Sequence, residues 1–78
     1  MNLIPKYSTL TSLYEHYTSP FRTIIFEDRK YMFVRIIRLN DLSQHIYRND
    51  EEQHTLFIHM RNNKPFYVNA VYSVKGVS

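Results

Sequence analysis

Hydrophobic residues recur at every second position along two segments in the middle of the chain, residues 31–38 and 54–61. Because successive side chains of a strand point to opposite faces, this alternation predicts two β-strands. One face is expected to form the core and to carry Met32, Val34, Ile36, Leu56, Ile58 and Met60. The opposite face, with Tyr31 at its edge and Tyr67 on a further strand, is expected to carry Phe33, Arg35, Phe57, His59 and Arg61. The pattern indicates a sheet with one core face and one contact surface.

The segment before these strands has a helical pattern. Leu10, Leu13, Tyr14 and Tyr17 follow the i, i+3, i+4, i+7 spacing of a single apolar stripe. Ser8 or Thr9 is suited to cap the first turn, because a hydroxyl oxygen accepts from a free backbone N–H there. The residue before Pro20 is pushed away from helical angles, so the helix is expected to end near Thr18.

The remaining segments complete the predicted order of elements. Residues 21–27 are rich in β-formers, and the short gap to residues 31–38 predicts an antiparallel hairpin. Residues 40–47 are predicted to form a short second helix that buries Leu42 and Ile46. Residues 48–52 are expected to be a solvated loop, and Asn62-Asn63 a turn with left-handed backbone angles. The last strand is expected at residues 66–74, with one face formed by Phe66, Val68, Ala70 and Tyr72.

Together these elements predict a single small α+β domain over residues 1–78. Its expected order is α-β-β-α-β-β, a four-stranded antiparallel sheet with the N-terminal helix packed on one face. An antiparallel sheet needs only one covered face, and the other is free for solvent or a partner.

Composition narrows the class of protein. The chain has 78 residues, is 44% hydrophobic and contains five Phe and seven Tyr, which favours a folded protein over a disordered one. A core of this size is marginal, so a homodimer is one expected way to add stability. The net charge of +3 favours polyanionic or acidic partners. The absence of cysteine and of a long apolar segment predicts a cytoplasmic protein without membrane insertion.

No motif for a cofactor or a metal is found, and none is expected to bind. His54 and His59 are five positions apart on one predicted strand and therefore face opposite ways. His16 and His45 lie on separate predicted helices, and no cysteine is available as a further ligand. For catalysis, His59, Arg61, Arg35 and Tyr67 are residue types that a metal-independent ribonuclease uses. They occur in most basic domains, so no enzymatic activity is predicted.

The sequence therefore predicts a non-enzymatic binding protein. The main interpretation is an accessory or inhibitor protein of the phage or mobile-element type that binds a host protein or a nucleoprotein complex. Aromatic and arginine side chains are enriched at the energetic centres of such interfaces. The alternative is a single-stranded nucleic-acid module, above all for RNA, because rings and cations on one sheet face can stack on bases and bind phosphates. The second alternative is the ribonuclease-like protein.

Overall fold

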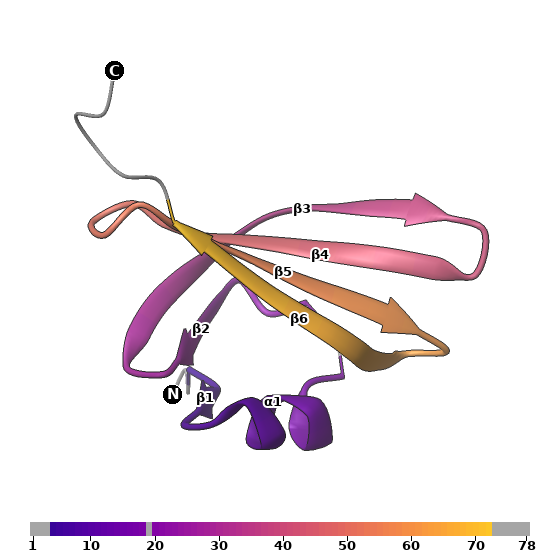
Figure 1. Ribbon diagram of the computed structural model, residues 1–78, viewed down its shortest axis with the longest axis horizontal. Helices are drawn as coiled ribbons and strands as arrows, with labels where there is room; N and C mark the ends of the chain where they lie inside the picture. Colours follow the sequence, from indigo (N-terminus) through magenta and orange to yellow (C-terminus); the bar gives the residue numbers. More distant parts are fainter. Residues whose placement is uncertain (1–3, 19, 73–78) are drawn as a thin grey trace.

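The computed structural model describes residues 4–18 and 20–72 of the chain. Most of these residues lie in strands, and one short helix precedes the long hairpins (Figure 1). The elements are β1 Lys6–Tyr7, α1 Leu10–His16, β2 Thr23–Phe26, β3 Arg29–Leu39, β4 Leu42–Asn49, β5 His54–Arg61 and β6 Lys64–Tyr72.

The strands form one six-stranded sheet in the order β1-β2-β3-β4-β5-β6. Strand β1 pairs with β2 in parallel, and each later strand pairs antiparallel with the one before it. Helix α1 packs against both β1 and β6, which are the two opposite edges of the sheet. The sheet must therefore curl around the helix, and Figure 1 shows α1 on one side of the strands with the long β3–β6 hairpins above it.

The predicted four-stranded antiparallel sheet with the order α-β-β-α-β-β is wrong. The sheet has two more strands than predicted and is mixed, because the N-terminal segment adds β1 in parallel to β2. Two backbone hydrogen bonds hold β1 in place, from the Ile25 N–H to the Pro5 carbonyl (2.9 Å) and from the Glu27 N–H to the Tyr7 carbonyl (3.0 Å). A two-residue strand has no alternation of its own, so only its partner strand identifies it.

The predicted helix over residues 40–47 is also wrong, because this segment forms most of strand β4. Asn40 has a φ of 57°, so it turns the chain directly from β3 into β4 instead of capping a helix. Strand β4 lies between β3 and β5 and is covered along much of its length. Its buried positions include the polar His45 and Asn49, which conceal the pattern of a strand.

Other local predictions are confirmed. Helix α1 is capped by Thr9, whose hydroxyl accepts from the Ser12 N–H at 3.1 Å. The third predicted strand has the bounds of β5, and the first predicted hairpin is β2–β3. Asn62 and Asn63 connect β5 to β6 with φ of 53° and 64°, the left-handed angles that a two-residue hairpin of this type requires.

The core lies between the sheet and the helix. Its residues are Tyr7, Leu13, Tyr17, Ile24, Phe26, Tyr31, Tyr47, Leu56, Ile58 and Met60. Burial of each large apolar side chain is worth roughly 1.5–3 kcal/mol, so these ten residues supply the main driving force for folding. The helix thus covers one face of the sheet, which we call the covered face; the other is called the open face. No helix among the described residues has the length and apolarity needed to cross a membrane.

Candidate binding surface

Strand register decides which side chains reach the open face. In an antiparallel pair, directly opposed residues share a face. Phe57 opposes Ile46 and Asn69, while its neighbours Leu56 and Ile58 are buried in the core. The open face of β3–β6 therefore carries, among others, Arg35, Ile37, Leu39, Leu42, Gln44, Phe57, His59, Arg61, Tyr67 and Val71.

A register shift in β3 divides the residues that the sequence places on this face. The pairing moves from Phe33↔Tyr47 to Arg35↔Ile46, so Val34 is an extra residue in β3. Such a β-bulge reverses the alternation of faces along the strand. Tyr31 and Phe33 consequently lie on the covered face, where Tyr31 is buried and Phe33 packs against the core.

The bulge also reverses the expected core positions. Met32 and Val34 were predicted in the core, but Met32 is 47% exposed and Val34 is 52% exposed. Beyond the bulge, the prediction holds for Ile36, which opposes the buried His45 and is half-buried itself. Of the seven predicted contact residues, the structure thus places five on the open face: Arg35, Phe57, His59, Arg61 and Tyr67.

The β5–β6 hairpin groups several rings on the open face. A second register shift, between His59 and Met60, lets both Phe66 and Tyr67 approach the same histidine. The ring centroid of His59 lies 5.2 Å from that of Tyr67 and 6.2 Å from that of Phe66. The guanidinium carbon of Arg61 lies 5.0 Å from the centre of the Phe66 ring, within the range of a cation–π contact. These contacts hold the Arg61 side chain beside the rings.

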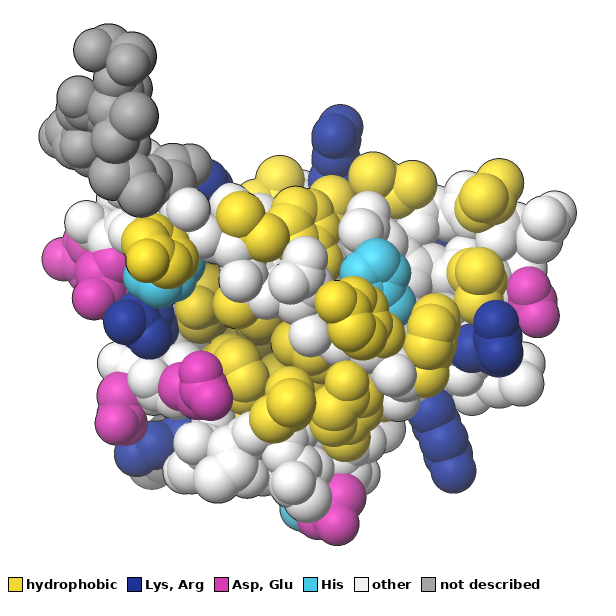
Figure 2. Space-filling model, in the orientation of Figure 1, with side chains coloured by type: hydrophobic (Ala, Val, Ile, Leu, Met, Phe, Trp, Pro, Cys, Tyr) yellow, Lys and Arg dark blue, Asp and Glu magenta, His cyan; other side chains and the backbone are white. Residues whose placement is uncertain are grey.

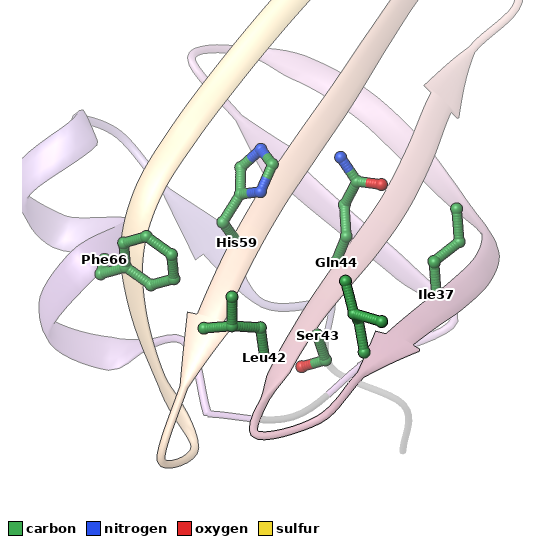
Figure 3. Close-up of a pocket in the computed structure, with 7 residues that line it drawn as sticks. Ile37, Leu42, Ser43, Gln44, His59 and Phe66 are labelled. Carbon is green, nitrogen blue, oxygen red and sulfur yellow. The ribbon is translucent and has the colours of Figure 1, made fainter.

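Next to this cluster is a hollow of about 220 Å³. Figure 3 shows side chains from β3, β4, β5 and β6 around it, with helix α1 behind the strands. Its walls are mainly aliphatic and aromatic, and they consist of Ile37, Leu39, Leu42, Ser43, Gln44, His59 and Phe66. Sites for small molecules usually measure about 300–1,000 Å³, so this hollow is too small for most of them and suits a single side chain.

The charged side chains that strands β3–β6 place on the open face are all basic, and Asp41 lies in the turn between β3 and β4. Strands β3–β6 contain no Asp or Glu, whereas Lys30, Arg35, Arg48, Arg61 and Lys64 lie on their open face. Arg48 is engaged at one end by Asp50, at 2.9 Å. Among the described residues, Arg35 and Arg61 take part in no ion pair. Two guanidinium groups on the open face therefore have no acidic partner in residues 4–18 and 20–72.

Large apolar side chains add to this surface. Leu39 is 68% exposed, Tyr67 51% and Phe66 48%. Figure 2 shows hydrophobic side chains across the middle of one view of the molecule, over β6 and in the region between β6 and α1, with Asp and Glu mainly towards its margins. Contiguous exposed apolar residues with a polar rim are typical of interaction surfaces.

Sequence reasoning missed part of this surface. The alternation of the last predicted strand places Phe66 on the same face as Val68, but the β5–β6 register shift brings it to the rings of the open face. The sequence predicts a helix at Leu42 and indicates no role for Ile37 and Leu39. The exposed apolar positions at the β3–β4 turn become visible only once residues 42–49 are recognised as a strand.

A second cluster of titratable groups lies on the covered face. The Tyr17 phenol oxygen is 2.7 Å from Nδ1 of His45 and 2.9 Å from the Tyr47 phenol oxygen, which accepts from the Phe21 N–H at 3.0 Å. Burial, followed by the charge of Arg38, lowers the pKa of His45. Burial raises the pKa of both Tyr17 and Tyr47. The cluster is enclosed, so it joins the helix to the sheet and does not face a ligand.

The described residues contain no group of three or more His, Cys, Asp or Glu side chains placed to hold a metal ion. The four residues of the ribonuclease alternative are spread over the open face, with His59 and Tyr67 adjacent and Arg61 held over Phe66. Arg35 lies on β3, two strands away from His59 on β5. The ribonuclease alternative therefore stays a prediction from sequence.

Comparison with family models, with curated proteins and with solved structures returned no match to this chain.

Proposed function

We propose that the chain is a non-enzymatic binding protein, an accessory or inhibitor protein of the phage or mobile-element type that binds a host protein or nucleoprotein complex through its open sheet face. The observation that supports this proposal is the combination on one face of exposed apolar side chains with Arg35 and Arg61, which form no ion pair within residues 4–18 and 20–72. Arginine and aromatic residues dominate the energetics of many interfaces. The lack of cysteine in the sequence is consistent with action in the cytoplasm.

The size of the molecule is sufficient for this role. A standard interface buries about 800 Å² on each partner, which is roughly one seventh of the 5805 Å² surface of this chain. The two longest dimensions of the molecule are 39 and 34 Å, and the long β3–β6 hairpins provide much of that breadth. One face of the sheet can therefore support a stable complex without rearrangement of the fold.

Affinity capture with matched variants tests the proposal. The tagged protein would be incubated with nuclease-treated host lysate, beside the double variant Arg61→Ala/Tyr67→Ala and the control Arg22→Ala/Leu10→Ala. All four altered side chains are exposed, but the control pair lies in α1 and just before β2. We expect the parent and control to retain the same partner and the face variant to lose at least nine-tenths of it. Full retention by a normally folded face variant would contradict the proposal.

Binding of single-stranded nucleic acid is the second candidate function. The grouping of His59, Phe66 and Tyr67 with two arginines favours it, because stacking on a ring is worth roughly 1–3 kcal/mol per base. Phosphate contacts make such binding steeply dependent on salt. Retention of an oligonucleotide at 50 mM salt that falls by orders of magnitude at 200 mM, and that the face variant lacks, would support this candidate. No retention at 50 mM would exclude it.

A further inference from the structure

We propose that the open face recognises an acidic protein segment that inserts one large apolar side chain, leucine or phenylalanine, into the hollow between β3 and β6. This inference rests on the proposed binding function and specifies the chemistry of the partner. It follows from the charge of the face, the composition of the hollow and the position of Arg61 beside it.

Charge complementarity selects an acidic partner. Strands β3–β6 carry five basic residues on their open face and no Asp or Glu. A second copy of the chain stacked through the same face would bring Arg35 and Arg61 towards arginines of like charge, which disfavours association. A segment rich in Asp and Glu would instead supply partners to the two guanidinium groups that have none among the described residues.

The hollow selects an apolar side chain. Ile37, Leu39 and Leu42 give the hollow an aliphatic lining, and Phe66 adds an aromatic ring. In Figure 3, Ile37 and Phe66 lie on opposite sides of the view, with Leu42 between them. At about 220 Å³ the hollow is below the usual range for a small-molecule site, and it is open to the surface. An anchor residue that fills such a depression at the centre of an interface typically contributes a large share of the binding energy.

The same geometry favours a protein segment over a nucleic acid. Branched aliphatic side chains offer no flat surface on which a base can stack. The most accessible ring at the hollow, that of Phe66, already has the Arg61 guanidinium on one face at 5.0 Å. Arg61 is thereby held next to the hollow, where it can receive a carboxylate close in sequence to the inserted residue.

Titration of the isotope-labelled protein with synthetic peptides, followed by NMR, tests this proposal. The probe is a capped peptide with the sequence Glu-Asp-Glu-Leu-Phe-Glu-Asp-Glu. One control peptide has Ser-Ser in place of Leu-Phe, and a second has Gln and Asn in place of Glu and Asp. Oligothymidine is the nucleic-acid probe. We expect the parent peptide to shift backbone amides of β3–β6 and to bind at least tenfold more tightly than either control peptide and the oligonucleotide.

Protein variants assign the two contacts. Leu39→Ser removes part of the wall of the hollow, and Leu10→Ser, on helix α1, is its control; both leucines are exposed. Arg61→Glu removes the charged contact, and Arg22→Glu makes the same change of net charge just before β2, which is three strands away from β5 in the sheet. We expect Leu39→Ser and Arg61→Glu each to weaken the binding of the parent peptide at least tenfold. The two control variants should change its affinity less than twofold.

Any other outcome of these titrations would contradict the proposal that the partner is an acidic segment with an apolar anchor residue. Equal binding of the Ser-Ser peptide would show that the hollow is not used, and tighter binding of oligothymidine would assign the face to nucleic acid. Absence of binding by every peptide would reject the acidic segment. The lysate capture distinguishes these failures from failure of the proposed function, because loss of a captured partner in Arg61→Ala/Tyr67→Ala would still place a binding site on this face.

Discussion

Tyr17 and His45, 28 positions apart in the sequence, are joined by a 2.7 Å hydrogen bond between the phenol oxygen and Nδ1. The bond connects the end of helix α1 to the middle of β4. A second hydrogen bond of 2.9 Å joins the phenol oxygens of Tyr17 and Tyr47. Because the Phe21 N–H donates to the Tyr47 oxygen, one direction satisfies every hydroxyl: Tyr47 donates to Tyr17, and Tyr17 donates to Nδ1 of a neutral His45. The helix is thus fixed to the sheet by polar contacts inside an apolar core.

Tyr17→Phe is expected to lower the free energy of unfolding by about 1–3 kcal/mol, because it leaves two buried polar groups without their partner. Urea unfolding monitored by circular dichroism measures the change. Tyr72→Phe is the matched control, since Tyr72 is 62% exposed, and it should alter stability by less than about 0.5 kcal/mol. Equal stability of the two variants would show that the hydroxyl of Tyr17 contributes nothing.

Acid is expected to destabilise the protein through His45. Burial and then the Arg38 charge lower the pKa of His45 in the folded protein below the value of 6.5 that applies to the unfolded chain. Below about pH 6.5 the unfolded chain therefore binds an extra proton, and the free energy of unfolding falls as the pH decreases. Above that pH the full contribution of neutral His45 is present.

The pH dependence of urea unfolding between about pH 7.5 and 5 tests this expectation. His45 is bonded to Tyr17, the C-cap residue of α1, which also bonds to Tyr47. The charge that acts on His45 is that of Arg38 from β3. His45→Gln is expected to be less stable at neutral pH and to lose this part of the slope. The same slope in His45→Gln and in the parent protein would assign the acid sensitivity to another group.

The sequence predicts local structure well where the signal is local. The Thr9 cap, the bounds of β5 and the left-handed Asn62-Asn63 turn each depend on a few adjacent residues. Strand β4 could not be predicted from adjacent residues in this way, because its buried polar residues obtain their hydrogen-bond partners from distant segments. His45 bonds to Tyr17 of the helix, and Asn49 donates to the Lys30 carbonyl at 2.9 Å. The i, i+4 spacing of Leu42 and Ile46 therefore favours a helix when the sequence alone is considered.

The candidate surface was predictable to the same extent. The alternation along β5 correctly placed Phe57, His59 and Arg61 on the face opposite the core. A β-bulge has no reliable sequence signal, so the exchange of faces in β3 could be seen only in the strand register. The hollow could not be predicted either, because it requires β3, β4, β5 and β6 to lie side by side.

Because the faces of β3 are exchanged, truncation of two adjacent residues is expected to lower the stability by very different amounts. Tyr31→Ala is expected to destabilise the protein by about 3–5 kcal/mol, since Tyr31 is 2% exposed and large-to-small changes leave a cavity. Met32→Ala should cost less than about 1 kcal/mol, because Met32 is 47% exposed and its sulfur accepts one 3.3 Å hydrogen bond from the Thr23 hydroxyl. Thermal and urea unfolding of both variants measure the costs. A greater loss in Met32→Ala would contradict the register of β3.

The turn between β2 and β3 offers a route to a more stable protein. Glu27 and Asp28 have φ of 50° and 65°, and both are left-handed angles that most side chains disfavour by roughly 1–2 kcal/mol. Asn-Gly is the preferred pair for a two-residue turn of this geometry. The double variant Glu27→Asn/Asp28→Gly is therefore expected to raise the free energy of unfolding by about 1 kcal/mol, measured as a higher urea midpoint with an unchanged slope. The Glu27 N–H still donates to the Tyr7 carbonyl in this variant, because the contact uses only backbone atoms.

Glu27→Val/Asp28→Val, with β-branched residues at the same positions, should be less stable than the parent protein. If the Val-Val variant were more stable than the Asn-Gly variant, the backbone could not have these left-handed angles at the turn.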